Sequence, residues 1–300
     1  MAKGSLPVAV IQQTASADKG ASLAITKRLV ARASAAGAAL VVLQELHTTH
    51  YFCQIENPDL FDLAEPIPGP SCEHLGALAR RHGVVLVASL FERRAAGLYH
   101  NTAVVFDADG SIAGTYRKMH IPDDPGFYEK FYFTPGDAGP GQGFQPISTS
   151  IGRLGVLVCW DQWYPEAARL MTLAGADLLI YPTAIGWDPR DLEAEKLRQR
   201  EAWITIQRAH AIANGLPVIV ANRVGLETDP SGQSQGIRFW GSSFIAGPQG
   251  ELLAEADTTS ETVLTATIDR GRGETVRRIW PFLRDRRVDA YANLTRRYID

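Results

Sequence analysis

Three residues able to carry out covalent catalysis each come at the end of a predicted strand. Glu45 follows the apolar strand LVVL, Lys118 follows a hairpin strand that ends in TYR, and Cys159 directly follows an apolar strand that ends in VLV. Attack of a thiolate on a carbonyl carbon needs a base that takes the thiol proton, and a carboxylate in a dry site can have its pKa raised into the useful range. An ammonium group and a backbone N–H beyond the nucleophile can then stabilise the oxyanion. The residues therefore predict acyl-transfer chemistry with Cys159 as nucleophile, Glu45 as base, and Lys118 with the backbone N–H of Trp160 as oxyanion donors.

Each of these residues also has a simpler interpretation. A free cysteine usually packs as a small hydrophobic residue, as we expect for Cys53 and Cys72, and a glutamate or lysine at the end of a strand is more often a solvated edge residue. The combination of nucleophile, base and ammonium group is what favours chemistry. A cysteine–histidine mechanism is the alternative, although no two of the seven histidines have a metal-site spacing such as His-Glu-x-x-His. We expect no metal and no organic cofactor.

Apolar strands alternate with helical segments along most of the chain. Strands are predicted from short apolar runs, and helices from apolar residues spaced three or four apart between a cap and a glycine. Ser71 is expected to cap one of these helices and Gly83 to end it. The sequence predicts strands at 7–12, 39–43, 84–90, 177–181 and 218–222, with helices around 25–33, 71–83, 165–175 and 191–214.

Two further pairs of strands are predicted to form β-hairpins. Their turns are Asp107–Gly110 and Gly247–Gly250, and their strands lie at 102–106, 112–116, 243–246 and 251–254. Hairpins pair antiparallel strands, whereas strand–helix–strand units pair parallel ones, so the sheets are expected to be mixed. The pattern indicates an α/β fold.

The composition limits the class of partner. The chain has 300 residues, of which 45% are hydrophobic and 21% charged, and a formal net charge of −3. Nucleic acids and anionic membranes select basic surfaces, so neither is the expected partner. Three cysteines indicate neither a disulfide framework nor a zinc site, and the start of the chain lacks the apolar core of a secretory signal. We expect a cytoplasmic protein with a small-molecule substrate.

One domain is expected to cover residues 1–300, without an internal linker. Its last segment, roughly 270–300, is rich in arginine and also carries Trp280, Tyr291 and Tyr298. Aromatic side chains have no role on a solitary solvated helix, so this segment is interpreted as an arm that packs on the body or on a neighbouring subunit. An exposed charged helix is the alternative.

The chain resembles the nitrilase superfamily of carbon–nitrogen hydrolases, which use a Glu-Lys-Cys triad. The resemblance spans nearly the whole chain and rests on Gln44-Glu45, Tyr116-Arg-Lys118-Met-His120, Cys159-Trp-Asp161 and Gly241-Ser-Ser-Phe-Ile-Ala-Gly-Pro248. It implies a four-layer α-β-β-α sandwich with mixed sheets, and dimers or larger assemblies. It also implies a fourth catalytic residue, Glu129, which orients the lysine and the nucleophile or water.

The segment after the cysteine resembles one branch of this superfamily, the N-carbamoylputrescine amidases. Relatives that hydrolyse N-carbamoyl-D-amino acids have two arginines three and four residues after the cysteine to bind the substrate carboxylate, and here these positions are Gln162 and Trp163. Two features near the presumed pocket depart from the branch, the segment Leu46–His50 and Trp187. The motifs shared with the branch are Tyr51–Gln54, Met119–Tyr128, Cys159–Glu166 and Tyr181–Gly186.

The resemblance implies hydrolysis of N-carbamoylputrescine to putrescine, carbon dioxide and ammonia through a covalent thiol intermediate, in polyamine biosynthesis from agmatine. Such a substrate has an ammonium group at its far end, which an anionic side chain should bind. Asp188 is the first candidate, whereas Asp161 and Asp123 could instead be turn or cap residues. The other residues expected at the substrate are Tyr51, Gln162 and Trp163.

Two other functions stay open. One is a superfamily amidase acting on an aliphatic amide, a nitrile or 3-ureidopropionate. The other is a catalytically idle relative that serves in binding or assembly. Against the idle relative stands the presence of all four residues Glu45, Lys118, Glu129 and Cys159, which a scaffold does not need.

Overall fold

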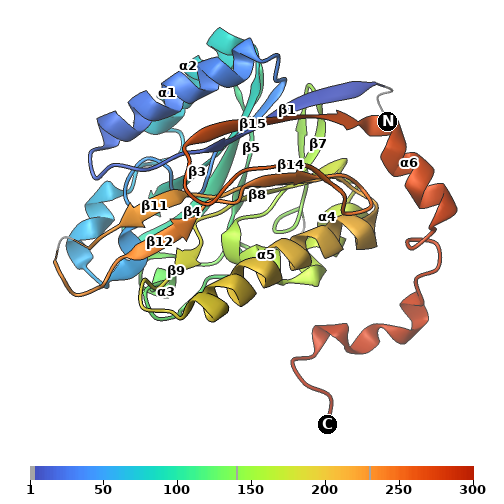
Figure 1. Ribbon diagram of the computed structural model, residues 1–300. Helices are drawn as coiled ribbons and strands as arrows, with labels where there is room; N and C mark the ends of the chain where they lie inside the picture. Colours follow the sequence, from blue (N-terminus) through green and yellow to red (C-terminus); the bar gives the residue numbers. More distant parts are fainter. Residues whose placement is uncertain (1–3, 140, 230) are drawn as a thin grey trace.

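Two six-stranded mixed sheets lie face to face, and helices cover the outer face of each sheet (Figure 1). The computed structural model describes residues 4–139, 141–229 and 231–300. Helices α1 and α2 contact the first sheet, and α4 and α5 contact the second. The predicted four-layer α-β-β-α sandwich is therefore confirmed. The helix bounds are α1 Lys19–Ala35, α2 Pro70–His82, α4 Pro165–Leu173 and α5 Glu193–Asn214.

Each sheet combines parallel and antiparallel neighbours, as predicted. The first sheet has the order β15 (Thr262–Asp269), β1 (Ser5–Gln12), β2 (Leu40–Val42), β3 (Val85–Ala95), β4 (Leu98–Phe106) and β5 (Ile112–Arg117). The second sheet has the order β14 (Leu252–Glu255), β13 (Phe244–Ala246), β10 (Val218–Ala221), β8 (Leu178–Pro182), β7 (Gly152–Val156) and β6 (Ile147–Thr149). Both predicted hairpins are present, as β4–β5 and β13–β14.

The central strands are apolar on both faces because each sheet is covered on both sides. Along β1, Val8 and Val10 belong to the core cluster between the two sheets, whereas Ala9 and Ile11 belong to the cluster under α1 and α2. Successive side chains of a strand point to opposite faces. The uninterrupted apolar runs of the sequence therefore fill two separate cores.

Two local predictions were wrong. Ser71 does not cap α2, because Gly69 occupies the N-cap position and Pro70 the first helical turn, where the missing N–H of proline has no cost. The backbone N–H of Ser71 instead donates to a carboxylate oxygen of Glu65. The strand leading to Cys159 ends earlier than expected, at Val156, and Cys159 begins a short 3-10 helix.

Shorter elements surround the ends of the central strands. A small sheet consists of β11 (Val224–Glu227), β12 (Ile237–Trp240) and β9 (Gly186–Trp187). Phe52 stacks on Phe91 with ring centroids 4.9 Å apart, within an aromatic cluster that fixes this region. The short helices are η1 (Phe52–Gln54), η2 (Pro58–Leu63), α3 (Glu129–Tyr132) and η3 (Cys159–Trp163).

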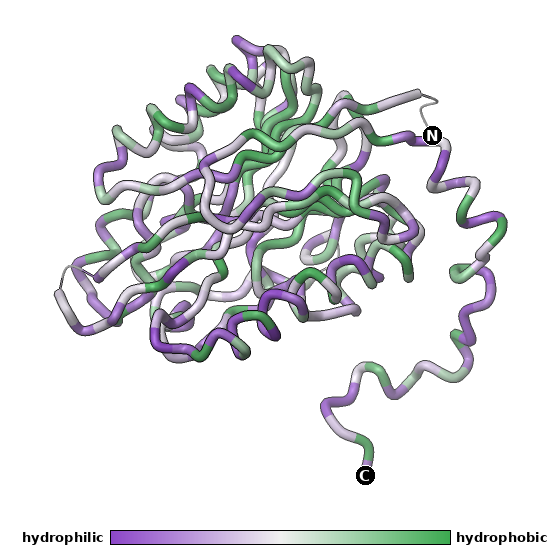
Figure 2. The backbone as a smooth tube through the Cα atoms, viewed as in Figure 1, coloured by the Kyte–Doolittle hydropathy of each residue, from purple (hydrophilic) through white to green (hydrophobic). Residues whose placement is uncertain are grey.

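The C-terminal segment leaves the body of the molecule (Figure 1). It comprises α6 (Arg270–Ile279), η4 (Val288–Ala290) and η5 (Ala292–Thr295). Val276 is buried and Arg277 donates to the carbonyl oxygen of Asn214, which attaches α6 to the body, but no residue after Ile279 is buried. Figure 2 shows hydrophobic residues interspersed with polar ones along this segment.

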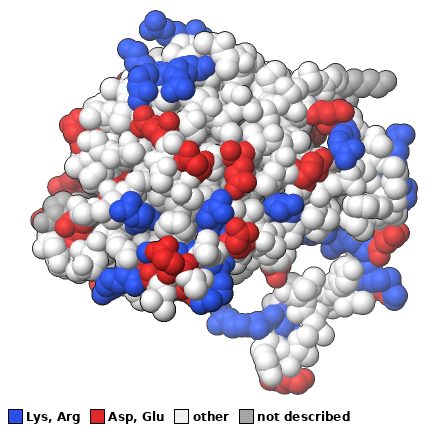
Figure 3. Space-filling model, in the orientation of Figure 1, with Lys and Arg blue, Asp and Glu red and all other residues white. Residues whose placement is uncertain are grey.

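The surface has no dominant sign of charge. Lysine and arginine lie among aspartate and glutamate over the face drawn in Figure 3, in keeping with the small net charge. Within the described ranges, no helix combines the length and the apolar character that crossing a membrane requires.

Candidate active site

The predicted nucleophile lies at the first position of η3. Cys159 has a φ of 44°, a left-handed conformation that is uncommon for a residue with a Cβ and that gathers at functional sites. Its side chain is 4% exposed, and its thiol donates to the carbonyl oxygen of Ala184 with Sγ and O 3.9 Å apart. The thiol thus has a fixed position at the edge of the buried core.

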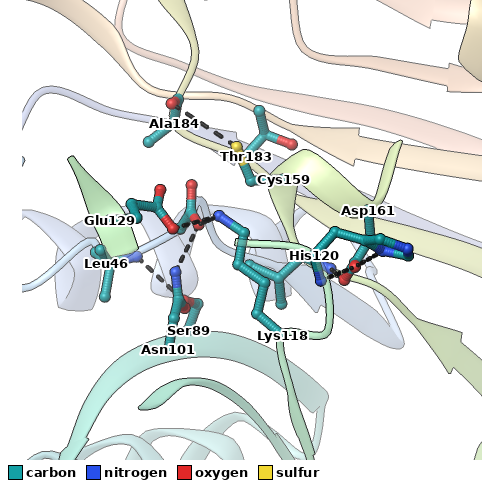
Figure 4. A network of polar contacts seen from close by, with 12 residues as sticks. Leu46, Ser89, Asn101, Lys118, His120, Glu129, Cys159, Asp161, Thr183 and Ala184 are labelled. Atoms are coloured by element: carbon teal, nitrogen blue, oxygen red, sulfur yellow. Dashed lines mark hydrogen bonds and ion pairs between the residues drawn. The ribbon is translucent and has the colours of Figure 1, made fainter. Parts of the chain in front are cut away.

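Lys118 lies between the two predicted glutamates, Glu45 and Glu129, of which Figure 4 labels Glu129 beside it. Its Nζ is 2.9 Å from Glu45 Oε1 and 2.6 Å from Glu129 Oε2, and all three side chains are fully buried. Glu45 comes from the end of β2, Lys118 from the end of β5, and Glu129 from the start of α3. Two strands of the first sheet and a short helix thus place one charged group each at a common point.

Neutral side chains fix the two carboxylates. Asn101 donates from Nδ2 to Glu45 Oε1 at 2.6 Å, and Ser89 in turn donates to Asn101 Oδ1 at 2.8 Å. The Tyr51 hydroxyl donates to Glu129 Oε1 at 2.7 Å. Glu45 Oε2 has no hydrogen-bond partner among the described residues, so one oxygen of the predicted base is available to accept a proton.

Burial and mutual charge set the proton affinities of this cluster. Burial alone would lower the pKa of Lys118, but Glu129 and Glu45 outweigh it and raise that pKa well above its usual range. Burial raises the pKa of Glu129 to about 7, against the pull of Lys118 and with a further contribution from Glu45. Burial and the Glu45 carboxylate raise the pKa of the Cys159 thiol. Lys118 is therefore a permanent cation, and Cys159 is a thiol that needs a base.

Asp161 joins the cysteine segment to the lysine segment. Its buried carboxylate accepts from the backbone N–H of Val158 at 2.9 Å and from the Tyr116 hydroxyl at 2.8 Å. It also binds both the backbone N–H and the ring Nδ1 of His120, at 3.0 and 2.7 Å. The His120 ring stacks on Tyr164 at a centroid distance of 3.7 Å. Asp161 thus ties the loop after Lys118 to the residue before Cys159.

A cavity opens onto the cysteine, and its outer part is acidic. Cys159, Trp160, Trp163 and Glu129 line its inner part. Charged residues that line its outer part are Asp124, Asp188, Asp191, Glu195 and Arg198.

The predicted substrate residues fall into two groups. Trp163 and Asp188 line the cavity, as does Trp160. Tyr51, Asp161 and Gln162 are buried and do not line it. Tyr51 donates to Glu129, and the side-chain Oε1 of Gln162 accepts from Thr183 and Trp203. Asp123 is exposed and is not among the residues that line the cavity.

The segment Leu46–His50, which differs from the expected branch sequence, is largely buried. His47 is fully buried, and burial together with Arg223 lowers its pKa to about 3, so it is neutral. Sequence reasoning missed Asn101 and Arg223, whose side chains contact the residues around Glu45. Neither lies in a recognisable motif, and only the fold brings them to the site.

The whole chain matches known carbon–nitrogen hydrolases. The family model described as "Carbon-nitrogen hydrolase" matches residues 7–278, so the chain belongs to this family, the nitrilase superfamily. The chain is 45% identical to N-carbamoylputrescine amidase of Arabidopsis thaliana, over 95% of this chain and 93% of that one. It is 39% identical to citrullinase of Francisella tularensis, over 98% and 99% of the two chains. A crystal structure of a carbon–nitrogen hydrolase from Helicobacter pylori has 57% identity and a TM-score of 0.95, covering 99% of this chain and 100% of that one.

Proposed function

We propose that the protein hydrolyses N-carbamoylputrescine to putrescine, carbon dioxide and ammonia, as a cytoplasmic step of polyamine biosynthesis. The observation that carries this proposal is the buried Glu45–Lys118–Glu129 cluster beside Cys159, in a chain similar over almost its full length to an N-carbamoylputrescine amidase. No step of the proposed chemistry requires a metal or an organic cofactor.

The first half of the proposed reaction forms a carbamoyl enzyme. Glu45 takes the thiol proton of Cys159, and the thiolate attacks the ureido carbonyl carbon. Lys118 and the backbone N–H of Trp160 stabilise the oxyanion. Glu45 then gives its proton to the leaving nitrogen, ammonia departs, and a thiocarbamate links Cys159 to the substrate.

The second half returns the enzyme to its starting state. Water, deprotonated by Glu45 with orientation from Glu129, attacks the thiocarbamate carbonyl carbon. The carbon–sulfur bond breaks, and the thiol of Cys159 regains its proton. The released carbamate decomposes to putrescine and carbon dioxide.

The acidic outer cavity supports a substrate with a cationic tail. Asp188 remains our candidate for binding the ammonium group, although its carboxylate already forms a two-pronged ion pair with Arg190, with Nη2 and Oδ2 2.5 Å apart. Asp124 and Asp191 line the same cavity and add negative charge around its mouth. Charge of one sign around a cleft concentrates ligands of the opposite sign.

Citrulline is a second candidate substrate because it carries the same ureido group. Its tail bears a carboxylate as well as an ammonium group, so it needs a cation in the outer cavity. Arg198 lines that cavity, and Arg190 lies at the adjoining hollow that shares Asp188. The relative named citrullinase matches nearly the full chain.

A substrate screen with purified protein tests the proposal. Ammonia release is measured with N-carbamoylputrescine, citrulline, N-carbamoyl-β-alanine and a short aliphatic amide. We expect the highest kcat/KM with N-carbamoylputrescine. A large preference for N-carbamoyl-β-alanine would contradict the proposal, because that substrate carries only a negative tail.

We also propose that the chain forms one domain over residues 1–300 whose C-terminal arm, roughly residues 270–300, mediates homo-oligomerisation. Exposed apolar side chains occur on the arm, such as Trp280 and Phe282, and on α4, as Leu170 and Leu173. A hollow lies between these two surfaces. A second copy of the chain would cover both.

A further inference from the structure

Arg223 is fully buried and binds the loop that carries the base. The residue comes just after β10, in the sequence Asn222-Arg223. Its Nη2 donates to the carbonyl oxygens of Glu45 at 3.0 Å and Leu46 at 2.6 Å, and its Nη1 donates to that of Thr49 at 2.9 Å. Three carbonyl groups of one turn thus converge on one guanidinium group.

This turn needs an external anchor. Leu46, the residue after the base, has a φ of 46°, which is unfavourable for a side chain with a Cβ. The Arg223 guanidinium satisfies the Leu46 carbonyl oxygen at the shortest of its three contacts with the turn. A planar fork with fixed donor directions suits several carbonyl groups at once, which a lysine ammonium does not.

The partner of Arg223 reaches the second catalytic carboxylate. Glu227, on β11, accepts from Arg223 Nη1 at 2.7 Å and from the backbone N–H of Tyr51 at 2.6 Å. The hydroxyl of that same Tyr51 donates to Glu129. A single buried ion pair is therefore linked to the Glu45 loop on one side and to Glu129, through Tyr51, on the other.

Stability alone does not account for this pair. The Arg223 and Glu227 side chains are 0% and 3% exposed, and removing two charges from water costs about as much as their attraction returns, so an apolar pair is often equally stable. The pair does not line the cavity at Cys159. Its contacts are with the segments that carry the two carboxylates.

We propose that the Arg223–Glu227 pair is a positioning device that sets Glu45 and Glu129 against Lys118 and Cys159. The inference rests on the proposed roles of these four residues and extends them to a pair that touches neither the substrate nor the thiol. A displacement of about 1 Å in a catalytic group can cost on the order of 10²-fold in rate. Loss of the pair should therefore lower kcat rather than raise KM.

The test replaces both charges together, so that no unpaired charge remains inside. The variant Arg223→Met/Glu227→Leu is compared with a matched remote pair, Arg28→Met/Glu261→Gln, whose ions are 2.6 Å apart and partly exposed. Thermal unfolding, kcat, KM and the pH dependence of kcat/KM are measured for both. We expect the Arg223/Glu227 variant to fold, with kcat lower by on the order of 10²-fold, KM within a few-fold and a shifted acid limb. The Arg28→Met/Glu261→Gln variant should match the wild-type protein in thermal unfolding, kcat, KM and pH dependence.

A folded Arg223→Met/Glu227→Leu protein with normal kcat would overturn the inference. If that protein does not fold, Arg223→Lys decides, because it keeps the charge and loses the fork: full activity would overturn the inference, and a lower kcat at unchanged KM would support it. The rate at which iodoacetamide alkylates Cys159 gives a readout without substrate. We expect slower alkylation in the variants even if N-carbamoylputrescine proves to be the wrong substrate, so the two proposals fail independently.

Discussion

A thiol buried beside two carboxylates holds its proton at rest. Burial and the Glu45 charge both raise the pKa of Cys159, so the thiolate forms only when the proton has an acceptor. Glu45 offers an oxygen without a hydrogen-bond partner among the described residues, while Lys118 compensates the charge. The arrangement favours proton transfer coupled to attack over a standing thiolate.

Removal of the proposed nucleophile, Cys159, tests this proton-transfer scheme directly. Cys159→Ala and Cys159→Ser should each lose roughly 10³-fold or more in ammonia release, since the hydroxyl of serine is a far weaker nucleophile at this pH and alanine has none. Intact-protein mass spectrometry of the wild-type protein during turnover should show a carbamoyl adduct that both variants lack. Near-normal turnover by either variant would rule out the covalent scheme.

The carboxylate pair predicts the acid limb of the pH profile. Burial raises the pKa of Glu129 to about 7 from 4.5, so the native state keeps a proton that the unfolded chain releases, and this site lowers stability as pH rises from about 4.5 to 7. If the ionised cluster is the active form, kcat/KM should fall below an apparent pKa of about 7 that belongs to the coupled cluster.

Two substitutions should move that limb in opposite directions. Glu129→Gln removes the carboxyl group whose pKa is raised to about 7, so the limb should shift to lower pH while kcat falls, because Lys118 loses one partner. Tyr51→Phe removes a hydrogen bond that favours ionised Glu129, so the limb should shift to higher pH. Shifts of equal sign in pH–rate profiles would contradict the assignment.

At the scale of elements, the site depends on how segments are tied together. Asp161 accepts hydrogen bonds from the segment before Cys159 and from the loop after Lys118. Asp161→Asn replaces one acceptor oxygen with a donor that faces these N–H groups. We expect a loss of about 1–3 kcal/mol in the free energy of unfolding and a lower kcat, measured by denaturant unfolding and ammonia release.

Asp123, an exposed aspartate on the loop after Lys118, provides the control. Asp123→Asn lies on the loop after Lys118, which Asp161 contacts through His120, but it is exposed, so it should change the unfolding free energy by no more than about 0.5 kcal/mol. Equal effects of the two substitutions would show that Asp161 does not join the segments.

The sequence predicted helices and strands well where a pattern of neighbouring residues specifies them. Apolar runs identified β1, β2 and β8, and turn residues identified both hairpins. The helix cap at Ser71 was wrong because Pro70 already starts the helix. The strand before Cys159 was placed too long because its last residues, Leu157 and Val158, are as apolar as those of a strand.

The site was only partly predictable, because only some of its residues lie in local sequence motifs. Glu45, Lys118 and Glu129 lie in recognisable motifs, and their side chains form ion pairs in the structure. Asn101 and Arg223 reach Glu45 from β4 and from beyond β10, and their roles follow from sheet order, which no local pattern contains. Asp161 was expected at the substrate because a carboxylate near a nucleophile has several uses, and only burial distinguishes them.

At the scale of the whole molecule, the C-terminal arm is the part with the least packing against the rest of the chain. After Ile279 no side chain is buried, although Leu294 is 63% and Ile299 58% exposed. Apolar side chains concentrated on one extended segment mark an interaction site more often than free surface. The hollow between this arm and α4 adjoins Leu170 and Leu173, which are also exposed.

Truncation after Ile279 should therefore reduce the size of the proposed homo-oligomer while leaving the sandwich folded, because α6 and its attachment to Asn214 remain. Sedimentation velocity should show a smaller species than the full chain, and Leu170→Arg should have the same effect, since it places a charge in the surface that we propose a second copy covers. Ile112→Arg is the matched control, at an apolar residue on β5 that is also exposed but does not line the hollow. If truncated and full-length chains sediment with the same number of subunits, the arm does not hold the assembly together, and its apolar residues require another partner.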